Sequence, residues 1–123
     1  TMVGLDVTHQ IMLSAQHLDQ LAGAQPVIGE DLRAIAQLYL AFYRQRSGLD
    51  GCHMHDATAI AFLLRPDLFK GKSGRIEIIR AGVQAGRSIL HPDRKARHTA
   101  LVKVDHQACL QLWLDTIAAS WLK

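Results

Sequence analysis

The strongest constraint on the fold is a short stretch without charged side chains, residues 57–64, which Pro66 follows two positions later. A proline inside a helix removes a hydrogen bond and clashes with the preceding turn, so a helix through this stretch ends before Pro66. A helix that is apolar on nearly every side needs cover from other parts of the chain. A chain of 123 residues, 49% of them hydrophobic, is large enough to give that cover in one compact unit. We therefore expect residues 1–123 to form a single domain.

Three further helices are predicted from the helical spacing of apolar side chains and from residues that start or stop helices. The first covers residues 8–22, with Thr8 as its N-cap and Gly23 as its stop. The second covers residues 31–45, where Asp31 places negative charge at the helix start, and Ser47-Gly48 ends it. The last follows Asp105, which is a good N-cap, and runs to about residue 122.

Four strands are predicted outside these helices. Residues 2–7 are mostly apolar, which is typical of a strand buried in a parallel sheet. Residues 75–80 alternate in polarity, residues 83–90 return as a strand broken at Gly86, and residues 99–104 form another strand. The predicted fold class is α/β, with a small mixed or partly parallel sheet flanked by helices.

Positive charge is mild and scattered, with one local cluster. The net charge is +3, and the cluster within residues 91–98 consists of Arg94, Lys95, Arg97 and His98. No aromatic side chains interleave with these charges, so stacking on nucleic-acid bases is not indicated. We interpret the cluster as a solvated loop and expect no nucleic-acid partner, with weak nucleic-acid or anion binding as the alternative.

The two cysteines, Cys52 and Cys109, lie far apart and form no CxxC pair. Neither a disulfide framework nor a zinc ribbon is indicated, and free thiols are typical of a reducing cytoplasm. No stretch reaches the roughly 18 apolar residues of a membrane span, and no signal peptide is visible. We therefore expect a cytoplasmic location and no membrane partner.

The chemistry is concentrated in residues 51–61, where His55 and Asp56 stand side by side where a loop meets the apolar helix. A carboxylate there can ligate a hard cation, and an imidazole can move a proton near neutral pH. Two other interpretations remain open. Asp56 can be a helix cap beside an ordinary loop histidine. Alternatively, Cys52, His53 and His55 can be soft ligands for zinc or copper, although no fourth ligand is evident.

The chain resembles the C-terminal part of the inosine–uridine-type nucleoside hydrolases. The resemblance covers essentially the whole chain and about the last two-fifths of a typical member. It is carried by MVGLDVTHQ at residues 2–10, Phe42-Tyr43, His55-Asp56 with Ala59 and Ala61, Ile76-Glu77, Gly82, Gly86 and the strand at residues 100–104.

The resemblance implies hydrolysis of the N-glycosidic bond of ribonucleosides with the help of a bound calcium ion. Asp56 matches the family's C-terminal calcium-ligand aspartate. His55 matches the histidine that protonates the leaving base in the purine-accepting branch. Tyr43 and the loop at residues 44–51 match the region that closes over the base of the nucleoside.

Two departures from the family pattern limit what we expect of the chain alone. Ala57 stands where the family has proline, and the family's N-terminal cluster Asp-x-Asp-x-Gly-x-Asp-Asp is absent. Calcium takes six to eight oxygen ligands, of which Asp56 can give at most two. We expect the isolated chain to bind no calcium and to be inactive without the N-terminal part of the enzyme. The alternative is a non-catalytic module that forms a homo-oligomer and covers exposed apolar side chains such as Leu5, Ile11 and Phe62.

Overall fold

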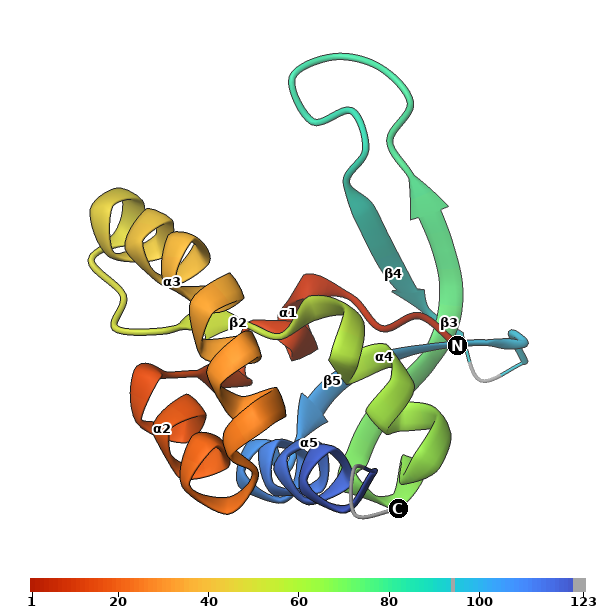
Figure 1. The fold of residues 1–123 in the computed structure, drawn as a ribbon. Helices are drawn as coiled ribbons and strands as arrows, with labels where there is room; N and C mark the ends of the chain where they lie inside the picture. Colours follow the sequence, from red (N-terminus) through yellow and green to blue (C-terminus); the bar gives the residue numbers. More distant parts are fainter. Residues whose placement is uncertain (94, 121–123) are drawn as a thin grey trace.

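A computed structural model describes residues 1–93 and 95–120 (Figure 1). Its elements in chain order are α1 (Leu5–Thr8), β1 (Met12–Leu13), α2 (Ala15–Ala24), α3 (Pro26–Ser47), β2 (Cys52–His53), α4 (His55–Leu64), the 3-10 turn η1 (Pro66–Leu68), β3 (Phe69–Ile78), β4 (Ser88–Pro92), β5 (His98–Val104) and α5 (His106–Ser120). In this part of the chain, no helix has both the length and the apolarity that a membrane crossing requires.

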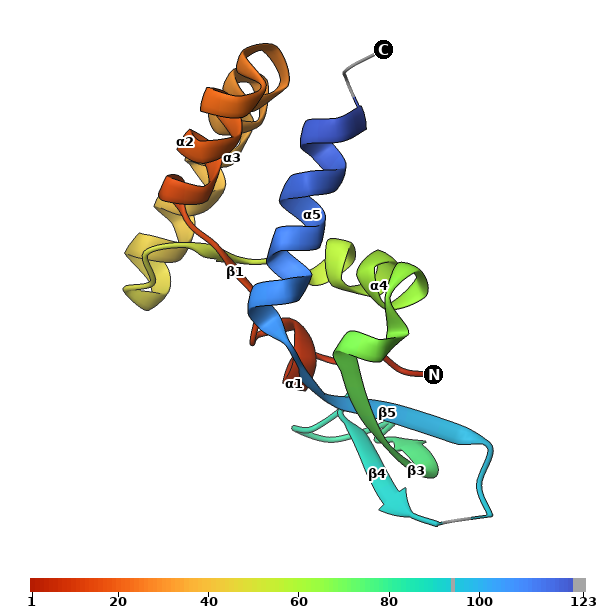
Figure 2. The ribbon, with the colours of Figure 1, turned by 90° about the horizontal axis from the view of Figure 1, so that it is seen from below.

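Two small sheets stand among the helices, so the predicted α/β class is confirmed. Strands β4, β3 and β5 form an antiparallel sheet in that order, and β1 pairs antiparallel with β2. Met2 adds a parallel bridge to Ala100 at the edge of the larger sheet. Strands β3 and β4 extend away from the helices as a hairpin (Figure 1). Helix α5 lies between the α2–α3 pair and α4 (Figure 2).

The predicted strand at residues 2–7 is wrong. Only Met2 pairs with the sheet, and the chain then turns into the short helix α1, which buries Val7 and Thr8. A short apolar run fits a buried helical turn as well as a buried strand, because periodicity cannot be read over so few residues. Thr8 therefore ends α1, and Ser14 is the residue that caps α2.

Helix α3 begins five residues before its predicted start, at Pro26 in the first turn. Proline suits this position because the first turn has no intrahelical use for its missing N–H. The predicted end is confirmed: Gly48 closes the helix with a φ of 65°. Helices α2 and α3 approach closely at Gly29, where an added Cβ would collide with the backbone of Ala22.

The larger sheet differs from its prediction at the strand ends. Strand β3 begins at Phe69, six residues before its predicted start. Its first half contains a β-bulge and little apolar alternation, so the sequence pattern did not indicate a strand there. Strand β4 begins only at Ser88, because Gly82 and Gly86 have φ values of 80° and 91° and form a loop. Strand β5 and the cap of α5 are confirmed, with Asp105 Oδ1 accepting the Ala108 N–H at 3.1 Å. The predicted final residues of this helix lie outside the described part of the chain.

The core gathers buried side chains from α1, α2, α4, α5 and both sheets, and α3 packs partly buried side chains against it. Its buried members are Val7, Ile11, Leu13, Leu18, Cys52, Met54, Ala61, Phe69, Leu101 and Cys109. Helix α4 is less covered than its composition predicts, since Ile60, Leu63 and Leu64 are more than half exposed. Of the three apolar residues predicted to be exposed, Leu5 is exposed, Phe62 is half-buried against Phe69, and Ile11 is buried, so the last prediction is wrong.

Candidate functional site

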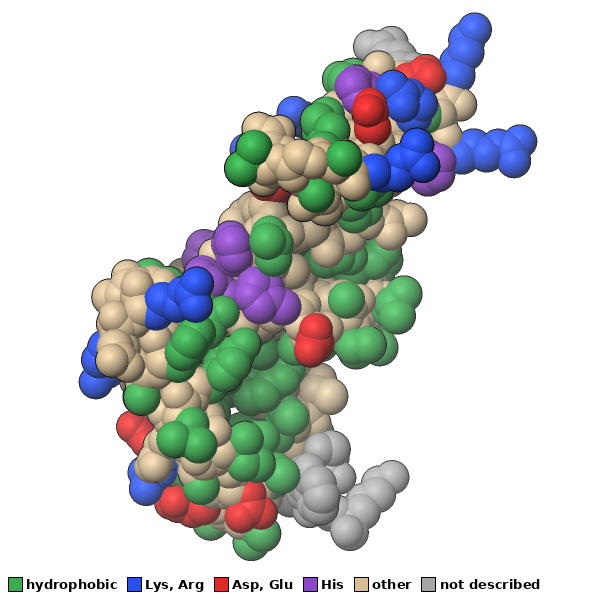
Figure 3. Space-filling view, turned by 90° about the horizontal axis from the view of Figure 1, so that it is seen from above, with side chains coloured by type: hydrophobic (Ala, Val, Ile, Leu, Met, Phe, Trp, Pro, Cys, Tyr) green, Lys and Arg blue, Asp and Glu red, His purple; other side chains and the backbone are tan. Residues whose placement is uncertain are grey.

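The candidate site lies where α1, β2, α3 and α4 meet. The chain brings Thr8, Tyr43 and His55 together here, although 47 residues separate the first from the last. Histidine side chains gather on this face beside apolar side chains (Figure 3). The predicted pair of Tyr43 and His55 therefore belongs to one constellation in space.

His55, the first residue of α4, contacts a hydroxyl at each ring nitrogen. Its Nδ1 lies 2.8 Å from Thr8 Oγ1, and its Nε2 lies 3.4 Å from Tyr43 Oη. The first distance is a well-formed hydrogen bond, and the second is at the outer limit of one. The ring is therefore held on its Nδ1 side and only loosely engaged on its Nε2 side.

Two further imidazoles surround His55. The ring centroids of His9 and His53 lie 4.6 Å apart, and those of His55 lie 5.5 Å from His9 and 5.9 Å from His53. Burial lowers the pKa of His53, and the proximity of His9 and His55 lowers it further. His53 Nδ1 is buried and has no hydrogen-bond partner among residues 1–93 and 95–120. The sequence indicated Thr8 only as a helix cap and gave His9 no role, although both lie in the segment that carries the family resemblance.

Tyr43 packs in an aromatic cluster at the C-terminal half of α3. Its ring centroid lies 5.3 Å from Tyr39, 5.8 Å from Phe42 and 5.7 Å from His53. Burial raises the pKa of the Tyr43 phenol, and its hydrogen bond with Tyr39 raises that pKa further. The phenol therefore keeps its proton at neutral pH and presents a neutral hydroxyl to His55.

Asp56 is exposed at the second position of α4 and does not cap the helix. The N-cap residue is Met54, and no side chain caps the helix end. The helix dipole favours a carboxylate in this first turn, so Asp56 is well placed as an anion. The helix-cap interpretation of Asp56 is therefore wrong, and its carboxylate faces solvent.

The described residues do not form a complete metal site. No group of three or more His, Cys, Asp or Glu side chains within residues 1–93 and 95–120 is placed to hold a metal ion. The single carboxylate of Asp56 falls short of the six to eight oxygens of a calcium shell. The alternative soft site also fails, because Cys52 is buried in the core and burial raises the pKa of its thiol.

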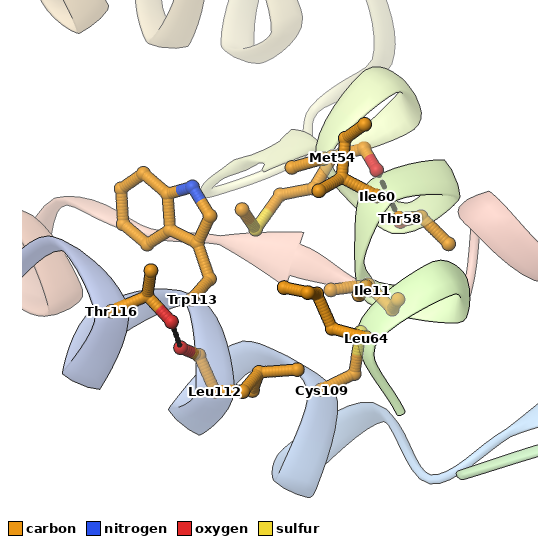
Figure 4. A pocket seen from close by; sticks show the side chains of 11 residues that line it. Ile11, Met54, Thr58, Ile60, Leu64, Cys109, Leu112, Trp113 and Thr116 are labelled. Atoms are coloured by element: carbon orange, nitrogen blue, oxygen red, sulfur yellow. Dashed lines mark hydrogen bonds between the residues drawn. The ribbon is translucent and has the colours of Figure 1, made fainter. Parts of the chain in front are cut away.

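A groove lies between α4 and α5. Its volume is about 190 Å³, and its walls include Ile11, Met54, Leu64 and Trp113 (Figure 4). Thr58 Oγ1 lies in this wall and donates to the Met54 carbonyl oxygen. The walls are mostly apolar, and burial raises the pKa of the Cys109 thiol that lines them, so this thiol is neutral near neutral pH.

The family model described as "Inosine-uridine preferring nucleoside hydrolase" matches residues 1–111. The chain belongs to this family. The family match includes Thr8, Tyr43, His55 and Asp56, so the constellation described above lies wholly within it.

Individual nucleoside hydrolases match over nearly all of this chain. Probable uridine nucleosidase 2 of Arabidopsis thaliana is 26% identical, with 96% of this chain and 40% of the relative covered. Pyrimidine-specific ribonucleoside hydrolase RihA of Shewanella sp. (strain ANA-3) is 25% identical, with 96% and 39% covered. The structure of a purine-preferring ribonucleoside hydrolase from Gardnerella vaginalis matches with a TM-score of 0.85 and 25% identity, over 95% of this chain and 39% of that one. The chain spans about two-fifths of the length of these nucleoside hydrolases.

Proposed function

We propose that this chain forms the leaving-group side of the active site in a ribonucleoside hydrolase, an enzyme that splits a nucleoside into base and ribose. Membership of the family supports the reaction class. The observation that carries the proposal is the position of His55, whose Nδ1 is bonded to Thr8 and whose Nε2 faces Tyr43. We further propose that the rest of the site comes from another part of the enzyme; this is supported by the match to only about two-fifths of each relative.

In the proposed reaction, His55 acts as the general acid. The bond between the ribosyl carbon and the base nitrogen breaks, and its electron pair goes to the base. His55 enters this step with protons on both ring nitrogens. It gives the Nε2 proton to the nucleobase, which leaves as a neutral molecule, and the ring remains neutral with its proton on Nδ1. The oxygen of a water molecule bonds to the ribosyl carbon. The proton that this water loses goes to a general base, a proton-accepting group outside the described residues.

We assign Tyr43 to the side of the site that receives the nucleobase. Its ring stands beside those of Tyr39 and Phe42, and flat aromatic surfaces suit a flat base. The relatives are named for both purine and pyrimidine nucleosides, so the proposed substrate is a ribonucleoside of either kind.

Asp56 is proposed to give one carboxylate to a calcium site that the rest of the enzyme completes. A calcium ion would polarise and orient the attacking water. The exposed carboxylate at the start of α4 supports this role, because it is free to face a further part of the protein.

The cytoplasmic location remains a prediction, as does the absence of a nucleic-acid partner; Arg94 of the basic cluster lies outside the described residues.

A chimeric enzyme tests the proposed function. This chain replaces the matching region of the Gardnerella vaginalis hydrolase, and the release of base from inosine and uridine is measured. We expect activity in the chimera and a loss of about 100-fold or more in kcat for His55→Ala, the range for removal of a general acid. His98→Gln, at an exposed histidine in β5, is the matched control. An active chimera in which His55→Ala matches the control contradicts the proposal.

A second candidate, a self-associating module, is favoured by one observation. The side chains of Val27, Ile35 and Leu38 on α3 are 81%, 73% and 83% exposed. A row of such apolar side chains is typical of a surface that another protein covers. Light scattering after size-exclusion chromatography tests it: a dimer that Leu38→Glu converts to a monomer supports the module, whereas a monomer at every concentration counts against it.

A further inference from the structure

Backbone hydrogen bonds on both sides hold Thr8 in place. It is the last residue of α1, its N–H donates to the Gly4 carbonyl at 3.1 Å, and its carbonyl accepts the Ile11 N–H at 3.3 Å. The residue is only 4% exposed. Its hydroxyl therefore points from a rigid position and is largely shielded from water.

Within the part of the chain that the structure describes, the Thr8 hydroxyl has one side-chain partner, Nδ1 of His55 at 2.8 Å. A buried hydroxyl is costly when its proton finds no acceptor. In a neutral imidazole, one nitrogen accepts and the other carries the proton. Donation from Thr8 to Nδ1 therefore favours the tautomer of His55 that carries its proton on Nε2.

We infer that Thr8 is a positioning residue for His55: its hydroxyl holds Nδ1 and thereby directs the Nε2 proton toward Tyr43 and the substrate side. The inference rests on the proposed role of His55 as general acid. It adds a residue that does not touch the substrate but decides which ring nitrogen does. The contact between Nε2 and Tyr43 Oη is long, at 3.4 Å, so this nitrogen stays available to the nucleobase of the substrate.

A hydroxyl is suited to this task because it can both donate and accept. When the ring carries protons on both nitrogens, the Thr8 oxygen accepts from the Nδ1–H. After Nε2 gives its proton to a leaving nucleobase, the neutral ring retains the Nδ1 proton, and Thr8 still accepts it. The ring returns to the resting tautomer by taking up a proton at Nε2 and losing the Nδ1 proton. A carbonyl oxygen cannot bond to a bare Nδ1, and an amide N–H cannot bond to a protonated one. The Thr8 hydroxyl therefore holds the ring through the whole proton transfer.

Nitrogen NMR of the full 123-residue chain tests the inference without any nucleoside. Spectra of the histidine rings are recorded at about pH 8.5, where imidazoles with ordinary pKa values are neutral. His55→Gln assigns the resonances. We expect wild type and Thr8→Ser to show His55 with its proton on Nε2, and Thr8→Val, which keeps the shape but lacks the hydroxyl, to show both tautomers. A wild-type spectrum with the proton on Nδ1 overturns the inference, even if Thr8→Val does not fold. A folded Thr8→Val variant with the wild-type spectrum also overturns it.

The chimeric enzyme separates this inference from the proposed function. If Thr8 positions His55, Thr8→Val lowers kcat by about tenfold with little change in KM, and Thr8→Ser restores most of it. Equal losses for valine and serine overturn the inference. If His55→Ala does not lower the activity of an active chimera, the proposed function is overturned. The tautomer result is not affected by that outcome, since the NMR measurement requires no catalysis.

Discussion

The hydroxyl of Tyr43 lies 3.4 Å from Nε2 of His55, although the two residues come from different helices and lie twelve positions apart. The turn at Gly48 and the pairing of β2 with β1 bring the end of α3 back against the start of α4. Tyr43, which is predicted to lie beside the nucleobase, is therefore a neighbour of His55, which is predicted to protonate it.

The ring of Tyr43, rather than its hydroxyl, is expected to stabilise this junction. Tyr43→Phe keeps the contacts with Tyr39, Phe42 and His53 and should change the free energy of unfolding by less than about 1 kcal/mol. Tyr43→Ala removes the ring and should cost about 2 kcal/mol, less than a fully buried aromatic side chain. Urea denaturation measures both. Equal losses for the two variants would show that the hydroxyl contact dominates.

Calcium should not bind tightly to the chain alone. Asp56 offers one exposed carboxylate, and weak extracellular calcium modules with several ligands reach dissociation constants of only about 0.1–1 mM. We expect 1 mM calcium, about the upper end of that range, to leave the melting temperatures of wild type and Asp56→Asn unchanged. Saturable micromolar binding by titration calorimetry that Asp56→Asn abolishes would show that the chain itself completes the site.

His53 should make the chain less stable in mild acid. Its pKa in the folded chain is below the ordinary value of 6.5, so the unfolded chain binds more protons in the window just below 6.5. Stability therefore falls as the pH drops from 6.5 toward the folded pKa, and this contribution is flat above that window. Urea titrations at several pH values should show a smaller fall for His53→Gln than for wild type. His98→Gln, at an exposed histidine, should behave as wild type; an unchanged fall in His53→Gln would exclude His53 as its source.

Two glycine substitutions in adjacent helices should have opposite effects. A methyl group at Gly29 would collide with the backbone of Ala22, so Gly29→Ala forces α2 and α3 apart and should cost about 1–3 kcal/mol. A methyl group at Gly23 meets nothing within 4 Å, so Gly23→Ala should stabilise α2 by up to about 1 kcal/mol. Thermal unfolding compares the two. A neutral Gly29→Ala would mean that the helix crossing adapts without loss.

The sequence by itself determined the elements with strong local signals. The helix at residues 55–64, the cap at Asp105 and the stop at Gly48 follow from side-chain chemistry within a few residues, and the structure has all three. The family followed from short motifs spread along the chain. His55 and Tyr43 were named from those same motifs.

Tertiary structure decided where local signals are weak or absent. Residues 5–8 became helical because the chain leaves the sheet edge at Met2 and buries Val7, a contact that no short window can indicate. The Thr8–His55 hydrogen bond and the ring contacts of His9 with His53 and His55 join segments more than 40 residues apart. Such contacts depend on the packing of helices and strands around a shared core, so only the folded chain brings their side chains together.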